Sequence, residues 1–432
     1  MKIEIQIPTL TTPQKVFLVV SGILTLIFIL LLAGVFPGAR NKGEVTTIDF
    51  WGVDGSSSWS TAISKYQKEN PSIKISYRSI NQPEYEKTLI DALAAGRGPD
   101  IFMVDNNWLL EHGNKMKFAP SDVIAVEEFS ELYFKSAQQD FTLSNNVYAL
   151  PVNMDTLALI YNRDLLDKSG ILSPPRSWDD LDNVIEQITV FNGEKMVRGA
   201  ISLGYTDDIT LNGPDVLGLL FQQNDIPITN NTYTKSTVNT TKSRELIQKY
   251  VSYGSAGTDR HAYSTSLGSS LEAFAEGKLA LQPLYYYQLS ELDELRPDFE
   301  YAVSEMLQED PNSPINYPDY QGIAVALTSD QPDIAWDFVF NTATDPDIME
   351  SYTGRANRLP ALKELSNKYT DLKGTSIYIK QALSARSSLR PGEDVETIFN
   401  DAIGEYVIEP SNIRSILSGV QDQITDLLPF ND

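Results

Sequence analysis

The feature that most constrains the fold is an alternation of short apolar strands and amphipathic helices near the start of the polar part of the chain. Strand-like runs at Val45–Trp51, Ile73–Tyr77 and Ile101–Val104 are separated by two segments whose apolar residues recur at helical spacing. The last run is apolar throughout, as expected for a strand buried on both faces. Strands that alternate with helices pair in parallel, so we predict an open α/β sheet here.

Polar and aromatic residues follow the first and third of these strands. They are Trp51, Asp54 and Ser56 after the first strand, and Asn106, Asn107 and Trp108 after the third. Ligands gather at the carboxyl ends of strands in open parallel sheets, so both loops are candidate binding loops. Two alternatives stay open. The serine-rich loop also suits a plain helix cap, and the two tryptophans suit a core position equally well.

A further candidate lies in the stretch Leu150–Leu166, which reads LPVNMDTLALIYNRDLL. A polar turn that carries Asp155 leads into an apolar strand and then into a helix start. A buried carboxylate needs hydrogen-bond partners, so Asp155 is satisfied either by its own turn or by a polar ligand. We favour the ligand, with the turn as the alternative.

Aromatic residues add to this picture. A run of three tyrosines, Tyr285–Tyr287, follows a short strand candidate at Leu279–Leu281, and Tyr205 ends another. Successive side chains of a strand point to opposite faces, so Tyr285 and Tyr287 are the candidates for a cleft, with at least one ring of the run packed elsewhere. A carboxylate beside aromatic faces suits a sugar, because its hydroxyls donate to the acid and its apolar face covers the ring.

The first 44 residues predict a membrane anchor. Val16–Phe36 holds 21 residues without a charge, which as a helix would span about 31 Å, enough to cross the hydrocarbon core of a bilayer. Cleavable signals have shorter apolar regions of about 7 to 15 residues. We therefore expect a cytoplasmic segment (1–15), an uncleaved transmembrane signal anchor (16–36) and a linker (37–44). The body then lies on the extracellular or periplasmic side of the cell membrane, in a single-pass arrangement.

Composition narrows the function classes. The chain has no cysteine, which excludes disulfides and thiol chemistry. Its net charge is −24, which argues against nucleic acid as a partner. Both features support a body that faces outward from the cell. Its two histidines, His112 and His261, show no metal-ligand spacing, and no serine lies in a nucleophile motif. We predict no metal, no cofactor and no catalysis. A glycoside hydrolase stays the enzymatic alternative, because 58 acidic residues can include a carboxylate pair.

Six sequence blocks, in order and spacing, resemble the extracellular solute-binding proteins of ABC importers. The resemblance is to the sugar-binding family that includes maltose-binding protein, and it spans roughly residues 45–365. The blocks are Tyr66–Pro71, Ala94–Ile101, Tyr148–Leu165, Trp178–Leu181, Phe274–Ala280 and Arg358–Ala361. The chain departs from many relatives at its start, where they carry a lipid-attachment cysteine and this chain has the apolar segment.

The resemblance implies an α/β, two-lobed periplasmic-binding-protein-like fold (type II), preceded here by one N-terminal transmembrane helix. It implies lobe 1 at 45–152 plus 284–328 and lobe 2 at 153–283 plus 329–432, joined by crossing strands. A monomer would hold a sugar or oligosaccharide between the lobes and pass it to the permease subunits of an ABC transporter. An adhesin or sensor that kept the fold is the alternative.

The resemblance also implies roles for individual residues. The two loops named above become binding loops, Asp155 presents its carboxylate to sugar hydroxyls, and Tyr285–Tyr287 becomes an aromatic stacking segment. Arg355 lies near another loop of the cleft and is a further candidate.

Overall fold

The structure is a computed structural model that describes residues 45–203, 212–370, 374–387, 392 and 394–428, together with residues 11, 12, 21 and 25. The expected anchor, Val16–Phe36, therefore lies outside the described residues except for Ser21 and Thr25, and Tyr205 lies outside them too. Among the described residues, no helix combines the length and the apolar character needed to span a membrane.

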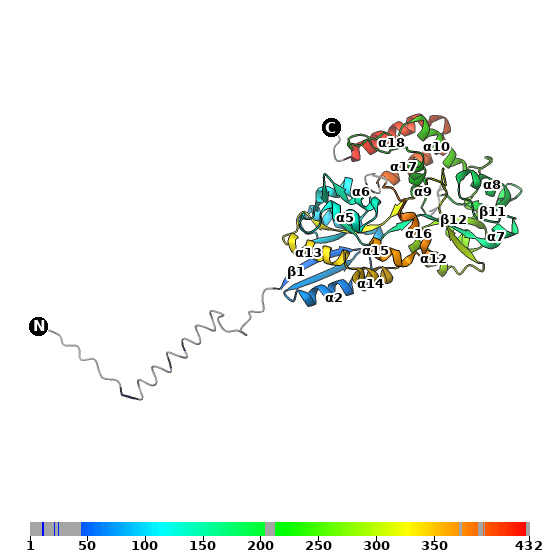
Figure 1. Ribbon diagram of the computed structural model, residues 1–432. Helices are drawn as coiled ribbons and strands as arrows, with labels where there is room; N and C mark the ends of the chain where they lie inside the picture. The colour runs from blue at the N-terminus through cyan, green and yellow to red at the C-terminus, as the bar shows by residue number, and fades with distance from the viewer. Residues whose placement is uncertain are drawn as a thin grey trace. The chain divides into compact units, whose positions relative to one another are not determined.

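The first lobe is built on a mixed sheet (Figure 1). Its strands are β1 (Thr46–Gly52), β2 (Ile73–Ser79), β3 (Ile101–Asp105), β4 (Met116–Lys117), β7 (Ala149–Pro151) and β15 (Gln321–Ala326), and a small hairpin contains β5 (Thr142–Leu143) and β6 (Asn146–Val147). The order is β2-β1-β3-β15-β4, with β7 also pairing β15. β1 and β3 are parallel, as predicted, whereas β15 runs antiparallel to β3, β4 and β7, so the sheet is not purely parallel.

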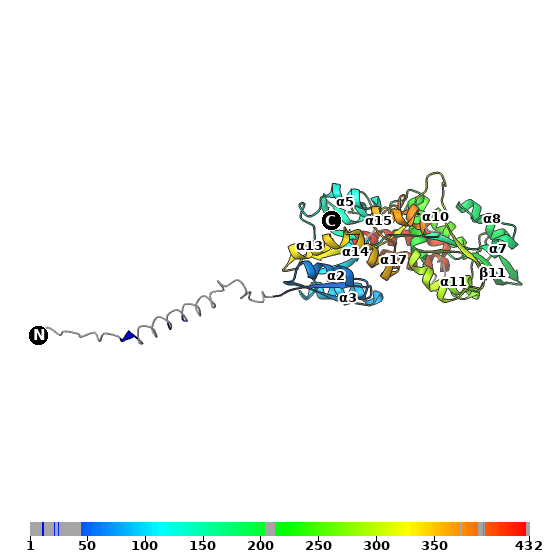
Figure 2. The same ribbon diagram turned by 60° about the horizontal axis from the view of Figure 1, so that its bottom comes forward.

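Helices of the first lobe come from two distant parts of the sequence. They are α2 (Ser60–Glu69), α3 (Gln82–Ala94), α4 (Leu109–His112), α5 (Val126–Leu132), α6 (Lys135–Phe141), α13 (Pro332–Ala343), α14 (Pro346–Ala356) and α15 (Lys363–Ser366). The colours of Figure 2 show this mixture, with α13 and α14 in yellow to orange beside the blue and cyan elements. The described residues 45–47 and 67–74 group into a small unit of their own, in which the Thr46 N–H donates to the Ser72 carbonyl (3.0 Å).

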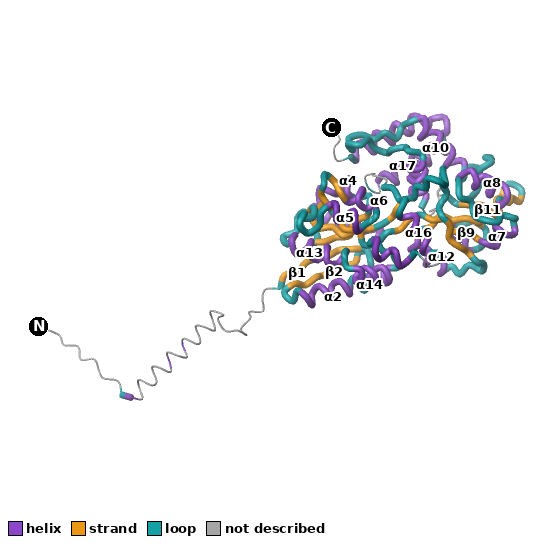
Figure 3. The backbone as a smooth tube through the Cα atoms, in the orientation of Figure 1, coloured by secondary structure: helices purple, strands orange, loops and turns teal. Residues whose placement is uncertain are grey.

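The second lobe has a five-stranded sheet. Its strands are β9 (Ala158–Asn162), β10 (Val190–Asn192), β11 (Lys195–Ile201), β12 (Leu279–Leu284) and β13 (Tyr301–Ser304), in the order β10-β11-β12-β9-β13. Its helices are α7 (Arg163–Lys168), α8 (Trp178–Ile188), α9 (Gly213–Gln223), α10 (Thr241–Ser252), α11 (Ser270–Ala275), α12 (Leu289–Glu294), α16 (Thr375–Ala382), α17 (Asp394–Ile408) and α18 (Ile413–Leu427). Figure 3 shows these helices around the orange strands.

The apolar run of β9 separates two cores of the second lobe. Leu157 and Leu159 join one hydrophobic cluster, while Ala158 and Ile160 join the other. This period of two is what a strand covered on both faces requires, and it explains why residues 157–160 include no polar side chain, although β9 ends at Asn162. At the start of α8, Ser177 and Asp180 form a capping box, a pattern of a serine followed three residues later by an acid that marks a helix start.

A short ribbon joins the two sheets. The chain leaves β7 of the first sheet, forms β8 (Asp155–Thr156) and enters β9 of the second. It returns from β13 through β14 (Pro318–Asp319) to β15, and β14 pairs antiparallel with β8 so that Asp319 faces Asp155. α16 packs against β8, where the Thr156 hydroxyl donates to the Tyr378 carbonyl (3.1 Å).

The expected lobe boundaries differ from this arrangement in two places. β13, placed in lobe 1 by the sequence, pairs with β9 in the second sheet. α13, placed in lobe 2, packs on the first sheet, where Phe338 meets Phe50 edge to face (6.1 Å) and the Tyr66 hydroxyl donates to Asp337 (2.7 Å). The first difference arises because the chain returns to the first sheet at the ribbon near 318–319, later than the expected position of 284. The second arises because the chain stays with the first lobe through α15, beyond the expected boundary at 329.

Asp155 is part of this ribbon. Its carboxylate accepts hydrogen bonds from the backbone N–H groups of Thr156 (2.8 Å) and Tyr287 (3.3 Å), and the residue is 4% exposed. Burial raises the pKa of Asp155 to about 8; the backbone hydrogen bonds oppose the rise and the facing Asp319 adds to it. The ribbon therefore holds a carboxyl group that burial favours in its neutral form.

Gly322 of β15 provides a test of packing in the first lobe. A Cβ atom there would lie 2.7 Å from Phe141 Cε2 and 2.9 Å from the Leu150 carbonyl oxygen. We expect Gly322→Ala to lower the free energy of unfolding by about 1 to 3 kcal/mol, as overpacking does. The matched control is Gly354→Ala on α14, where a Cβ would meet nothing within 4 Å. This substitution should stabilise the helix by up to about 1 kcal/mol. Equal urea midpoints for the two variants would contradict this packing.

Asp155 provides a test of pH dependence. Its carboxyl stays protonated in the native state up to about pH 8, but in the unfolded chain it ionises near its ordinary pKa of 3.8. Between these values the native state holds one more proton, so the free energy of unfolding should fall as the pH rises from about 4 to about 8. Asp155→Asn should remove this part of the pH dependence, whereas Asp122→Asn, at an exposed position, should keep it. Urea denaturation across this range measures the effect, and equal pH slopes for wild type and Asp155→Asn would refute it.

Candidate functional site

A polar cavity of about 520 Å³ opens beside the ribbon, where elements of both lobes meet. The first lobe contributes Asp54 from the loop after β1 and Asp105 at the end of β3. The ribbon contributes Asp319, and the second lobe contributes Asp215 from α9 and Tyr287 next to α12. A cavity of this size, between two lobes and lined by convergent polar groups, is where a small ligand binds in many proteins.

A chain of hydrogen bonds holds the first-lobe carboxylates in place. The Tyr352 hydroxyl donates to Asp54 (2.7 Å), and the side-chain amide of Asn153 donates to the Tyr352 oxygen (3.3 Å). The Asn153 side-chain oxygen accepts a hydrogen bond from the Gln321 backbone N–H (2.9 Å), and the Gln321 side-chain amide donates to Asp105 (2.9 Å). The two carboxylates are thus fixed to the residues that flank the ribbon, which pre-orients them toward the cavity.

Charge in the lining is strongly one-sided. Of the lining side chains that the structure describes, six are acidic, namely Asp54, Asp105, Asp215, Glu291, Asp319 and Glu396, and one is basic, Arg358. Burial raises the pKa of Asp54, although the Tyr352 hydroxyl and the charge of Arg358 oppose that rise. Burial would lower the pKa of Arg358, but Asp319 and other nearby groups outweigh it, so this guanidinium is charged.

Two tyrosines and an arginine form a stacked group at the cavity wall. The Arg358 guanidinium lies over the Tyr287 ring, 4.1 Å from its centroid, and the Tyr287 ring is stacked with that of Tyr285 (5.7 Å, 6°). The Tyr285 hydroxyl donates to Asp215 (2.9 Å), and Tyr285 is 1% exposed. Of the two predicted tyrosines, Tyr287 therefore lines the cavity and Tyr285 packs beside it.

Of the predicted site residues that it describes, the structure brings four to the cavity and places the others elsewhere. Those that line it are Asp54, Asn106, Asn107 and Tyr287. Trp108 is 1% exposed in the core, stacked near Tyr85 (6.0 Å). Trp51 lies under the Arg78 guanidinium (4.5 Å) and is not part of the lining. The core alternative for Trp108 thus fits the structure, and a ligand contact for the four lining residues stays a prediction.

Three other predicted positions need correction or lie apart. Asp155 is not part of the lining, because its carboxylate is buried against the backbone of its own ribbon. Ser56 is exposed and outside the lining. Arg355 is exposed on α14 and donates to the Ser57 carbonyl (2.8 Å), so its guanidinium is used by the first loop. Within the described part of the chain, these three side chains do not face the cavity.

Sequence reasoning missed two central residues of the cavity. Asp319 lies in a proline-rich segment without helical or strand periodicity, and only the pairing with β8 brings it to the ribbon. Arg358 belongs to one of the six family blocks and lies three positions after Arg355, the arginine that the sequence analysis predicts for the cleft. The helix α14 ends between the two, at Ala356, so Arg355 stays on the helix surface while Arg358 turns toward the cavity.

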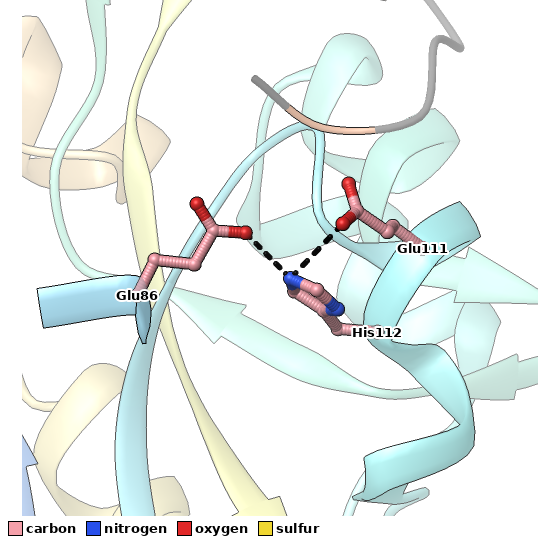
Figure 4. Close-up of side chains that lie close together, drawn as sticks. All are labelled: Glu86, Glu111 and His112. Carbon is pink, nitrogen blue, oxygen red and sulfur yellow. Dashed lines mark hydrogen bonds and ion pairs between the residues drawn. The ribbon is translucent and has the colours of Figure 1, made fainter. Parts of the chain in front are cut away.

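A possible metal-binding group lies outside the cavity. Figure 4 shows the His112 ring between Glu86 and Glu111, with Nε2 2.7 Å from Glu86 and 3.6 Å from Glu111. The Lys115 ammonium lies 3.3 Å from Nδ1. An ammonium only donates, so Nδ1 is an acceptor and Nε2 carries the proton that Glu86 accepts. These contacts account for the histidine without an ion. The sequence did not reveal the group because Glu86 comes from a different helix, α3.

Comparison by sequence places the chain among binding proteins. The model of the family described as bacterial extracellular solute-binding protein matches residues 52–349. The maltotriose-binding protein of Pyrococcus abyssi is 27% identical over 131 residues, which are 30% of this chain and 27% of that protein. In such matches the chain spans about a third of the length of its relatives.

Comparison by structure covers far more of the chain. The sugar-binding protein MalE of Xanthomonas citri superposes with a TM-score of 0.73 at 15% identity, over 88% of this chain and 97% of that one. An ABC substrate-binding protein of Listeria monocytogenes, in complex with cycloalternan, superposes with a TM-score of 0.69 at 18% identity, over 88% and 98%. The fold is therefore the two-lobed α/β fold of periplasmic binding proteins. The family model covers more than half of the chain, so the resemblance predicted from six blocks is confirmed, and the chain belongs to the bacterial extracellular solute-binding proteins.

Proposed function

We propose that this chain captures a sugar or oligosaccharide in the cavity beside the ribbon and delivers it to the permease subunits of an ABC importer. The observation that carries the proposal is a polar cavity placed at the crossing between two α/β lobes. Membership of a solute-binding family supports it, as does similarity to proteins described as binding maltotriose and cycloalternan.

The ribbon suits the motion that such a protein needs. Lobes that close on a ligand turn about a few connecting residues, and the ligand shifts the balance toward the closed form because it binds that form better. The crossing at β8 and β14 is short, and its two strands pair with each other. We infer that the lobes move about this ribbon while the hydrogen bonds of Asp155 keep the crossing intact.

Tethering completes the proposal. Val16–Phe36 would anchor the chain in the cell membrane as a single uncleaved span, with the binding domain outside, and the short linker 37–44 would hold the domain near the permease. The protein would act as a monomer and without catalysis. The alternative of an adhesin or sensor is tested by deleting the gene, because importer delivery predicts reduced uptake of the ligand and the alternative predicts unchanged uptake.

A thermal-shift screen of the purified full-length chain against mono- and oligosaccharides, polyols, amino acids and peptides tests the proposed function. A ligand at 100 times its dissociation constant should add about 2.7 kcal/mol to the stability of the folded domain. A shift confined to saccharides would support the proposal. Shifts confined to amino acids or peptides would contradict it, and so would a complete lack of response.

Substitutions of Asn107 and Arg355 test whether the ligand binds in the cavity of the structure or at the arginine expected from the sequence. Asn107 lines the cavity, and its Oδ1 atom is buried without a hydrogen-bond partner among the described residues. We expect Asn107→Ala to weaken saccharide binding by about 1 kcal/mol, roughly fivefold, the scale of one lost hydrogen bond. Arg355→Ala should leave the affinity unchanged, because Arg355 is exposed and not part of the lining. Calorimetry with the best saccharide of the screen measures both, and the reverse pattern would show that the structural assignment is wrong.

A further inference from the structure

The charge of the cavity indicates which kind of saccharide the protein takes. We propose that its ligand is an amine-bearing, cationic saccharide rather than a neutral one. This inference rests on the proposed function, because it assigns a chemical class to the ligand of the same cavity.

The first observation is the balance of charge. Among the described residues, six acidic side chains and one basic side chain line the cavity, so their formal charges sum to −5. The acids come from every part that surrounds the cavity: Asp54 and Asp105 from the first lobe, Asp319 from the ribbon, and Glu291 from α12. When lobes close on a ligand they exclude water, and repulsion between like charges grows as the effective dielectric constant falls. A neutral ligand leaves this repulsion in place, whereas an ammonium group reduces it.

The second observation is that other side chains of the protein already pack against the aromatic rings at the cavity wall. A neutral sugar gains much of its affinity from stacking on an open aromatic face. One face of the Tyr287 ring carries the Arg358 guanidinium, and the ring is also stacked with Tyr285. The two remaining tyrosines of the lining, Tyr317 and Tyr320, are 3% and 1% exposed. Recognition therefore falls to carboxylates and amides, the groups that bind ammonium and hydroxyl donors.

The third observation separates an organic cation from a metal ion. Among the described residues, three metal-ligating groups come within 4.8 Å of one another only at Glu86, Glu111 and His112, and none of these lines the cavity. The cavity carboxylates are instead distributed around a space of about 520 Å³. Such spacing suits an extended ligand that carries its ammonium and hydroxyl groups on a rigid ring system.

Glu291 is the most useful position for a charge test. It lines the cavity and is exposed, and among the described residues its side chain forms no hydrogen bond or ion pair that a glutamine would break. Glu294 lies on the same short helix, is equally exposed and is not part of the lining. Glu291→Gln and Glu294→Gln therefore remove the same charge from the whole molecule, but only the first removes it from the cavity.

The experiment uses the full-length chain and three trisaccharides that differ only in the substituent at carbon 2 of each ring. They are the β-1,4-linked trimer of glucosamine, the same trimer in N-acetylated form, and cellotriose. Calorimetry is run at low and high NaCl, with matched amine and neutral monosaccharides and with trilysine as a cation that has no sugar ring.

We expect the glucosamine trimer to bind at least about tenfold more tightly than either neutral trimer at low salt, because it alone carries positive charge into the cavity. The preference should shrink between about 50 mM and about 500 mM NaCl. Glu291→Gln should reduce it by about threefold or more, and Glu294→Gln should leave it unchanged.

Other outcomes would overturn the inference in distinguishable ways. Equal or tighter binding of a neutral saccharide would refute the cationic class while leaving the proposed function intact. Trilysine binding as tightly as the glucosamine trimer, with equal effects of the two glutamine variants, would indicate general attraction to an acidic protein and would also refute it. Lack of binding by every saccharide, charged or neutral, would contradict the inference and the proposed function together.

Discussion

The pairing of β8 with β14 is the contact on which the arrangement of both sheets depends. It consists of two residue pairs, Thr156 with Pro318 and Asp155 with Asp319, and here the chain passes from the first sheet to the second and back again. A buried carboxyl group left without hydrogen-bond partners in this crossing would cost about 1 to 3 kcal/mol. The backbone N–H groups of Thr156 and Tyr287 donate hydrogen bonds to the Asp155 carboxyl group. The bond from Tyr287 also holds the start of the segment that forms the cavity wall.

The two facing aspartates have different surroundings and different consequences. Asp155 is buried against backbone and stabilises the crossing, whereas Asp319 lines the cavity. Their proximity contributes to the raised pKa of Asp155. A single residue pair thus connects the geometry of the crossing with the electrostatics of the cavity. A ligand charge near Asp319 would also change the electrostatic potential at the Asp155 carboxyl group.

The cavity itself is built for polar recognition. Hydrogen bonds from Tyr352 to Asp54 and from Gln321 to Asp105 orient two carboxylates before any ligand arrives, which lowers the entropy cost of binding. The aromatic residues beside it are occupied by Arg358 and by one another. This division explains why an acidic protein with many aromatic residues presents mainly oxygen atoms to its cavity, and it makes charge the property by which such a site can distinguish one saccharide from another.

The sequence alone determined the elements whose signals are local. The parallel pairing of β1 and β3, the doubly buried run of β9, the capping box at Ser177 and Asp180, and the six family blocks were all readable from the spacing of residue types. The sequence also led to Asp54, Asn106, Asn107 and Tyr287, because each follows a strand signal or lies in a tyrosine run. Only the tertiary structure decided the roles of Asp155, Asp319, Arg355 and Arg358. Strand pairing between residues more than 150 positions apart, and the end of a helix at Ala356, determine which of these side chains reach the cavity. Residue spacing along the chain carries no information about such long-range contacts.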